Sequence, residues 1–138
     1  MSVFIWKYDT VTNNKISTRL NDIPYMNYVY IMLNPDIEGN YTYGDYEFEY
    51  EPFYVGKGRY KCVERHFWES SLKKYTPKNK IIRGLLRQGR APVTIILQDG
   101  LSSLNAHKLE NNLIRLIGRK DLNEGVLLNR IGGKVQNL

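Results

Sequence analysis

The chain has 138 residues, of which 42% are hydrophobic and 25% charged, so its size suits one compact globular domain and leaves no room for a second. Its one cysteine, Cys62, rules out an internal disulfide framework, and with only two histidines the sequence argues against a structural zinc site of four ligands. No apolar run approaches the roughly 18 residues of a membrane span, and the N-terminus lacks a signal-peptide layout, so we expect a cytoplasmic, intracellular protein that contacts no membrane.

The net charge of +6 is unevenly distributed along the chain. Residues 35–51 contain six acidic residues and no basic one, whereas residues 57–90 contain eleven basic residues and two acidic ones. Such a basic cluster favours a polyanion, since lysine and arginine that neutralise phosphates release condensed counterions. We therefore expect a face that binds nucleic acid, with a merely solubilising surface as the alternative. The residues expected to contact nucleic acid are Lys57, Arg59, Lys61, Lys80, Arg83 and Arg87.

The first half of the chain predicts strands. Residues 1–26 have a short apolar start and then polar, turn-prone sequence, which we interpret as an N-terminal strand or an irregular arm. Residues 27–33 are dense in tyrosine, valine and isoleucine and predict a strand, and residues 52–55 predict the next one. The acidic, tyrosine-rich residues 35–51 between them predict an inserted hairpin or loop.

The following segments predict helices. Residues 60–72 carry apolar residues at helical spacing. A second helix is predicted to begin at Pro77, with Thr76 as its N-cap, because proline is favoured at the first helical position. This helix is expected to reach about Gln88, since Gly89 follows as a stop signal.

The last elements complete the predicted fold. Residues 92–97 predict a third strand, and residues 103–117 predict a long helix. The apolar stripe predicted for this helix consists of Ala106, Leu109, Leu113, Leu116 and Ile117. The predicted fold class is α/β, a small three-stranded antiparallel or mixed sheet flanked by helices.

Two short tyrosine-containing segments are the first indication of a site. Tyr28-Val29-Tyr30 and Tyr54-Val55-Gly56 both read as strand, and the second leads into Lys57 and Gly58, where backbone can approach a ligand closely. This pattern predicts two phenols side by side above a basic turn. Taken singly, each tyrosine is better explained as a core aromatic residue.

Glu110 is the second indication of a site. It projects from the border of the apolar stripe of the last helix, where a carboxylate is costly to bury without a partner. No lysine or arginine stands three or four residues away, so its partner must come from elsewhere in the fold. A single-carboxylate site for a divalent metal and a salt bridge to the basic residues 57–90 are both consistent with this position.

Together these residues resemble the GIY-YIG nucleases over residues 28–133. The resemblance is carried by the two tyrosine segments, the basic helix after the second, Glu110 and Asn129. Residues 52–58, 79–89 and 117–133 look most like a phage-type, homing-endonuclease-like branch, which implies a phage gene in a bacterial host. The resemblance implies that residues 27–138 form the nuclease domain, with residues 35–51 as an insertion.

The resemblance implies a metal-dependent endonuclease that hydrolyses phosphodiester bonds of double-stranded DNA with a single Mg²⁺ or Mn²⁺. Tyr30 would act as general base or water-orienting group, helped by Tyr54, and Glu110 would hold the metal. A tyrosine titrates near 10, so nearby cations would be needed to favour its phenolate. Lys57 would meet the phosphate, and Asn129 would orient groups around the metal.

The sequence departs from this family's pattern at one arginine. The family places an arginine one helical turn before a histidine, and here Cys62 precedes His66 by four residues. Arg65 is the candidate replacement, although it projects about 100° away from His66 on a helix and could instead pair with Glu69. His66 itself would move a proton or touch phosphate, whereas His107 is expected to be a surface residue.

Two other functions fit parts of the sequence. If Cys62 marks a lost arginine, the chain is a catalytically impaired DNA-binding module. If exposed tyrosines of residues 41–50 stack on unpaired bases, it is an RNA-binding protein. Since only five residues follow Gly133, we expect a stand-alone nuclease, a homo-oligomer, a separate DNA-targeting partner, or a domain cut from a longer protein.

Overall fold

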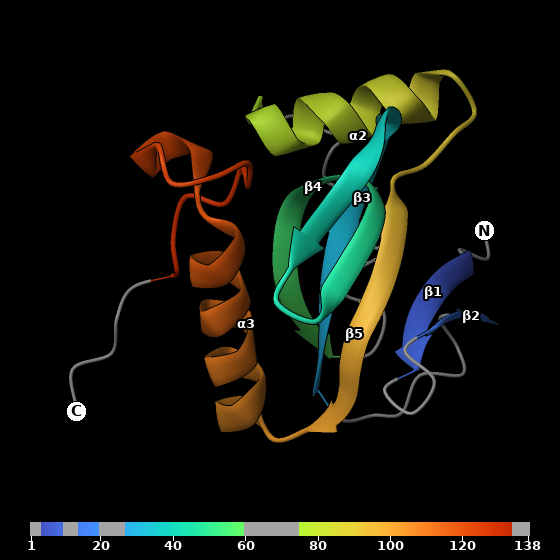
Figure 1. The fold of residues 1–138 in the computed structure, drawn as a ribbon. Coiled ribbons are helices and arrows are strands. Elements are labelled where there is room, and N and C mark those ends of the chain that lie inside the picture. Colours follow the sequence, from blue (N-terminus) through green and yellow to red (C-terminus); the bar gives the residue numbers. More distant parts are fainter. Residues whose placement is uncertain (1–3, 10–13, 20–26, 60–74, 134–138) are drawn as a thin grey trace.

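The computed structural model describes residues 4–9, 14–19, 27–59 and 75–133. In this part of the chain, a five-stranded sheet in the order β2-β1-β5-β3-β4 carries two α-helices (Figure 1). The strands are β1 (Phe4–Asp9), β2 (Asn14–Arg19), β3 (Asn27–Tyr43), β4 (Tyr46–Arg59) and β5 (Val93–Leu101). The helices are α2 (Pro77–Arg87), α3 (Ser103–Ile117) and the short 3-10 helix η2 (Lys120–Leu122). No helix within the described ranges is long and apolar enough to cross a membrane.

The centre of the sheet is antiparallel, which confirms the predicted arrangement of three strands. Tyr30 of β3 lies opposite Gly56 of β4 on one side and Ile96 of β5 on the other. The strand interpretation of residues 1–26 also holds, because β1 and β2 lie in this segment. β1 pairs antiparallel with β2 and parallel with β5, so this hairpin extends the sheet beyond β5 and makes it mixed. The edge of β5 offers unpaired backbone groups to β1. Residues 1–26 alone do not indicate this pairing.

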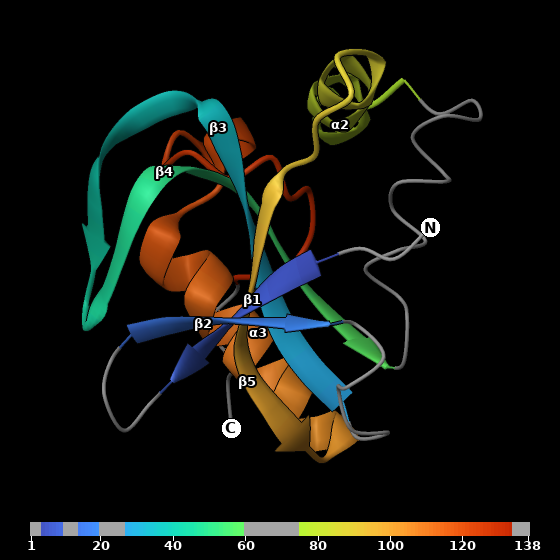
Figure 2. The ribbon, with the colours of Figure 1, turned by 90° about the vertical axis from the view of Figure 1, so that its right-hand side faces the viewer.

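β3 and β4 continue beyond the sheet as a hairpin arm, which confirms the hairpin interpretation of residues 35–51. The arm curves away from the sheet in Figure 2 and closes at Gly44, whose φ of +58° suits a residue without Cβ. At the base of the arm, Asp36 accepts a hydrogen bond of 2.6 Å from Arg90. This ion pair is exposed on both sides, so it stabilises the arm only slightly.

Aromatic packing holds the arm against the core. Phe48 is buried, and its ring stacks on that of Tyr46 at 6.2 Å. Tyr41, Tyr43, Tyr46 and Tyr50 are partly buried against the same core cluster. The expectation of exposed tyrosines in residues 41–50 is therefore wrong, because burial of their rings against the apolar core is favourable. The RNA-binding interpretation depended on exposed rings, and these four rings are partly covered.

Helix α2 begins and ends where its capping residues predict. The Thr76 hydroxyl accepts a hydrogen bond of 3.2 Å from the backbone N–H of Asn79, and Pro77 occupies the first turn. The helix ends at Arg87, followed by Gln88 as the C-cap and by Gly89 at a φ of +70°. Its apolar side, chiefly Ile82, packs on the sheet.

Helix α3 has the predicted bounds, and of the predicted apolar stripe only Leu116 is exposed. Ser102 is its N-cap, and Gly118, at a φ of +95°, ends it. Leu116, predicted to be part of the buried stripe, is 50% exposed, whereas Ile114 is 2% exposed. The prediction for Leu116 is wrong because the C-terminal segment, at Gly132 and Gly133, packs on Ile114 and draws that side of the helix into the core.

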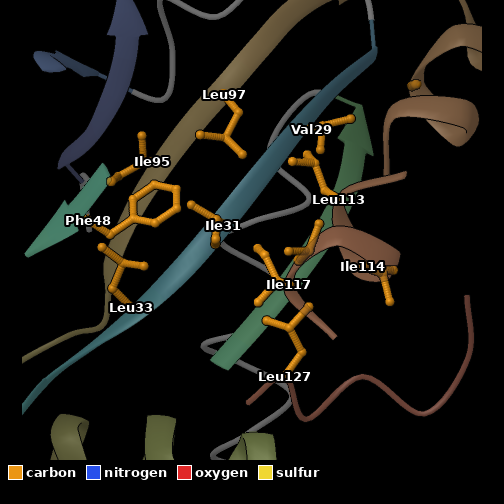
Figure 3. Close-up of a cluster of buried hydrophobic side chains, with 12 residues drawn as sticks. Val29, Ile31, Leu33, Phe48, Ile95, Leu97, Leu113, Ile114, Ile117 and Leu127 are labelled. Carbon is orange, nitrogen blue, oxygen red and sulfur yellow. The ribbon is translucent and has the colours of Figure 1, made fainter. Parts of the chain in front are cut away.

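The sheet separates two apolar clusters. On one face, Leu113 and Ile117 of α3 point toward Val29 and Ile31 of β3 (Figure 3). On the other face, Tyr28, Tyr30 and Met32 of β3 pack with Ile82 of α2. Because successive residues of a strand point to opposite faces, the tyrosines of β3 lie on the α2 side of the sheet.

Candidate active site

The register of β3 and β4 brings the two predicted tyrosines together. The ring centroids of Tyr30 and Tyr54 lie 6.3 Å apart with the rings tilted by 41°. Tyr28 lies on the other side of Tyr30, at 6.1 Å. Tyr30 is fully buried, whereas Tyr54 is partly exposed, so Tyr54 offers the solvent-accessible ring of the pair.

Gly56 provides the space for the Tyr30 hydroxyl. A Cβ placed on Gly56 would lie 2.5 Å from the Tyr30 Oη and 2.6 Å from its Cζ. No side chain carbon fits at such a distance, so the glycine of the second tyrosine segment determines where the phenol of the first segment can lie.

A substitution of Gly56 by alanine is therefore expected to displace the Tyr30 ring and to lower the free energy of unfolding by about 1–3 kcal/mol through overpacking. Urea denaturation would measure this change. The control is Gly84→Ala in α2, where a Cβ would meet nothing within 4 Å. That substitution should stabilise the protein by about 0.5–1 kcal/mol, because alanine is the better helix former. Equal effects of the two substitutions would contradict the role given to Gly56.

Asn129 caps the open edge of β4. Its Oδ1 accepts a hydrogen bond of 3.0 Å from the N–H of Val55, and its Nδ2 donates one of 2.7 Å to the Val55 carbonyl. The preceding residue, Leu128, donates its N–H to the Phe53 carbonyl at 2.8 Å. The side chain of Asn129 is thus engaged with the backbone between Tyr54 and Gly56, and it holds the second tyrosine segment in place.

Glu110 meets the same strand edge one step further along. Its carboxylate accepts a hydrogen bond from the backbone N–H of Lys57. Residues 53, 55 and 57 alternate along β4, so the C-terminal segment, Asn129 and Glu110 satisfy successive outward-facing backbone groups of one edge strand. The Tyr30 hydroxyl therefore lies at Gly56, and the Glu110 carboxylate lies at the next residue of β4, Lys57.

The charge around Glu110 is mixed. Burial raises the pKa of this carboxyl above its ordinary value, and the charges of Lys57 and His107 and the hydrogen bond from Lys57 oppose that rise. The Nζ of Lys57 lies 3.4 Å from Nδ1 of His107, within hydrogen-bond distance. His107 is exposed, as predicted, but the sequence prediction missed its place beside Glu110. The two residues stand three positions apart on one helix, and this spacing could have indicated that they are neighbours.

Two further residues support the C-terminal loop, residues 129–133, and were not predicted. Arg119 is 7% exposed and donates hydrogen bonds to the carbonyls of Arg130 at 2.5 Å and Gly132 at 3.1 Å. It also forms a bidentate ion pair with Asp121, at 2.9 and 2.6 Å. Asn111 accepts a hydrogen bond of 2.6 Å from the N–H of Gly133. These contacts hold the loop that carries Asn129.

The predicted nucleic-acid contacts fall in two places. Lys57 and Arg59 are exposed at the end of β4, and Lys80, Arg83 and Arg87 lie on α2, where Arg83 is partly buried. A further cation of α2, Lys78, reaches the tyrosine pair, since its Nζ lies 4.5 Å from the ring centroid of Tyr54. The predicted helix over residues 60–72 lies outside the described residues, and with it Lys61, Cys62, Arg65 and His66.

A three-stranded antiparallel core sheet, helices around it and paired strand tyrosines define a fold consistent with the GIY-YIG nuclease superfamily. Residues 27–135 match the family model of the LEM-3-like GIY-YIG domain, and the chain belongs to this family. The domain is of nuclease type and implies a nucleic-acid substrate. No curated protein and no solved structure matches the chain. The finer assignment to a phage-type, homing-endonuclease-like branch stays a prediction.

Proposed function

We propose that the protein is a metal-dependent endonuclease that hydrolyses phosphodiester bonds of double-stranded DNA with a single Mg²⁺ or Mn²⁺ ion. The observation that carries this proposal is that the Tyr30 hydroxyl lies against Gly56 of β4 and the Glu110 carboxylate against the next residue of that strand, Lys57. A phenol and a desolvated carboxylate, with cationic neighbours, are the groups that water activation and phosphate charge stabilisation require.

Glu110 is the residue that would hold the metal. Within the described ranges, no three side chains of histidine, cysteine, aspartate or glutamate gather into a metal site. A single carboxylate nevertheless fits Mg²⁺, which binds through one or two carboxylates and keeps several waters and substrate oxygens. The desolvation of Glu110 suits this role, because a carboxylate removed from water gains from a nearby cation. When bound, the metal would polarise a phosphoryl oxygen and stabilise the leaving group.

The remaining residues have defined tasks in this proposal. Tyr30 orients the attacking water or accepts its proton, and Tyr54 assists it from the partly exposed side of the pair. Lys57 binds the phosphate from the end of β4, where its side chain is exposed. Asn129 is a positioning residue, since both polar atoms of its side chain hold the Val55 backbone. The second lone pair of its Oδ1 and the second N–H of its Nδ2 could still orient groups around the metal.

Incubation of supercoiled plasmid with the purified protein tests this function. Nicked and linear products should appear with Mg²⁺ or Mn²⁺ and be absent with a chelator, because the proposed chemistry depends on the ion. Tyr30→Phe, which removes only the hydroxyl, should slow the appearance of products by about a hundredfold or more. Salt-sensitive binding of DNA without any product would instead select the catalytically impaired DNA-binding module.

A further inference from the structure

A groove with a volume of about 700 Å³ opens between the start of α2 and the C-terminal loop. In Figure 1 these two segments, far apart in the sequence, lie next to each other at the left end of α2. Four cationic side chains line the groove among the described residues, and none of its described lining residues is acidic. They are Lys80, Arg83, Arg87 and Arg130.

Helical spacing accounts for one wall of the groove. Thr76, Lys80, Arg83 and Arg87 follow one another at intervals of four, three and four residues, so they form one stripe along α2. Arg130 comes from the opposite wall, and the hydrogen bond from Arg119 to its carbonyl holds its backbone there. A concave surface with cations on two walls concentrates positive potential and attracts a phosphate chain.

Tyr75 gives the groove a feature that phosphate binding alone does not explain. Its side chain is 89% exposed, although aromatic rings are normally buried. The guanidinium of Arg83 lies 4.7 Å from its ring centroid and supports the ring. An exposed, supported ring beside cations matches the two halves of a nucleotide, because the base stacks on the ring while the phosphate pairs with lysine and arginine.

The groove is connected to the candidate active site by both of its walls. Arg130 directly follows Asn129, whose side chain holds the strand edge beside Tyr54. On the other wall, α2 also carries Lys78, which lies over the Tyr54 ring. Helix α2 thus places one cation at the Tyr54 ring and three more along the groove.

We propose that this groove binds an unpaired nucleotide of the DNA strand, with its base stacked on Tyr75 and its backbone phosphates held by Lys80, Arg87 and Arg130. The proposal rests on the proposed function in that it takes the bound strand to belong to the DNA substrate. Paired bases are already stacked within a duplex, so only an unpaired base can use the Tyr75 ring. The groove would thus favour DNA that has a single-stranded segment near the cleaved bond.

Fluorescence anisotropy tests the proposal without cleavage. Protein carrying Glu110→Gln is titrated, in a chelator, into a labelled oligothymidine strand of about ten nucleotides or a blunt duplex of the same length. Tyr75→Leu should weaken binding of the single strand about tenfold and leave duplex binding nearly unchanged. Tyr75→Phe should restore single-strand binding, because the ring is retained. Because Tyr75 is highly exposed, Tyr75→Leu should leave the folded structure intact.

A charge variant tests the phosphate half of the groove. The logarithm of the binding constant for the single strand falls linearly with the logarithm of the salt concentration. Arg87→Gln should make this slope less steep by about 0.7, the value expected for one lost phosphate contact. The matched control is Arg115→Gln, an exposed arginine of α3 outside the groove, which should leave the slope unchanged.

Three results would overturn the assignment. In the first, Tyr75→Leu weakens binding of the single strand and of the duplex equally. In the second, it weakens binding of neither. In the third, the parent protein binds oligouridine more tightly than oligothymidine. Failure of the endonuclease proposal has a different signature. Single-strand binding that depends on Tyr75, together with intact plasmid in Mg²⁺, would support the groove and contradict the nuclease function.

Discussion

Replacing Glu110 by glutamine is expected to slow plasmid cleavage in Mg²⁺ by about a thousandfold, because charge stabilisation by the ion is worth several kcal/mol and each 1.4 kcal/mol is about tenfold in rate. Glutamine has the shape of glutamate and can still accept the hydrogen bond from the Lys57 N–H, but it carries no charge to hold a divalent cation. The first-order rate of nicking under single turnover would measure the loss.

The matched control is Glu47→Gln, the same chemical change on the exposed surface of the hairpin arm. It should leave the cleavage rate within about twofold of the parent, since surface substitutions away from a site have small effects. If the Glu110→Gln protein cuts as fast as the parent, this carboxylate does not bind the metal and the proposed mechanism is wrong.

A second readout of the same variant shows whether its fold is intact. Burial raises the pKa of Glu110, so the folded state binds this proton more tightly than the unfolded chain does. The ionised carboxylate therefore costs stability at neutral pH, and this cost disappears as the pH falls through the raised pKa toward the ordinary value of about 4.3. In a chelator, Glu110→Gln should be more stable than the parent at neutral pH, with a difference that shrinks on acidification. Urea midpoints at several pH values would measure it.

Replacing Asn129 by alanine is expected to lower the free energy of unfolding by about 3 kcal/mol and the melting temperature by roughly 10 °C. The substitution leaves both the N–H and the carbonyl of the buried Val55 without the partners that Asn129 supplies. An unsatisfied buried polar group costs about 1–3 kcal/mol. Cleavage should fall as well, because Val55 stands between Tyr54 and Gly56.

Asn112→Ala provides the comparison, since Asn112 is an exposed asparagine of α3. Its stability should stay within about 0.5 kcal/mol of the parent. Thermal and urea unfolding of the two variants would separate the effects. If Asn129→Ala keeps the stability of the parent and loses only activity, then Asn129 acts on the substrate or the metal and not on the strand edge.

Local signals were sufficient for most elements. The hydroxyl of Thr76, the ring of Pro77 and the glycine at position 89 act within one helical turn, so α2 could be delimited from sequence. Glycine at position 118 ended α3 in the same way. The β-propensity of tyrosine, valine and isoleucine likewise indicated β3 and β5.

The errors arose where a distant segment decided the environment of a residue. Leu116 and Ile114 are both apolar residues near the end of α3, and only the packing of the C-terminal segment on Ile114 distinguishes them. The tyrosines of the arm were expected to be exposed, yet packing against the core covers part of each ring. The hairpin of β1 and β2 depended on the free edge of β5.

The sequence by itself determined the elements, the paired tyrosine segments and the isolated position of Glu110, because these depend on residue type and on neighbours within a few positions. Only the tertiary structure decided how the site residues meet. Asn129 lies 74 residues from its partner Val55, and Glu110 meets Lys57 across a comparable distance along the chain. Such contacts form because the exposed edge of β4 must satisfy its backbone groups, and the fold brings these two side chains to it.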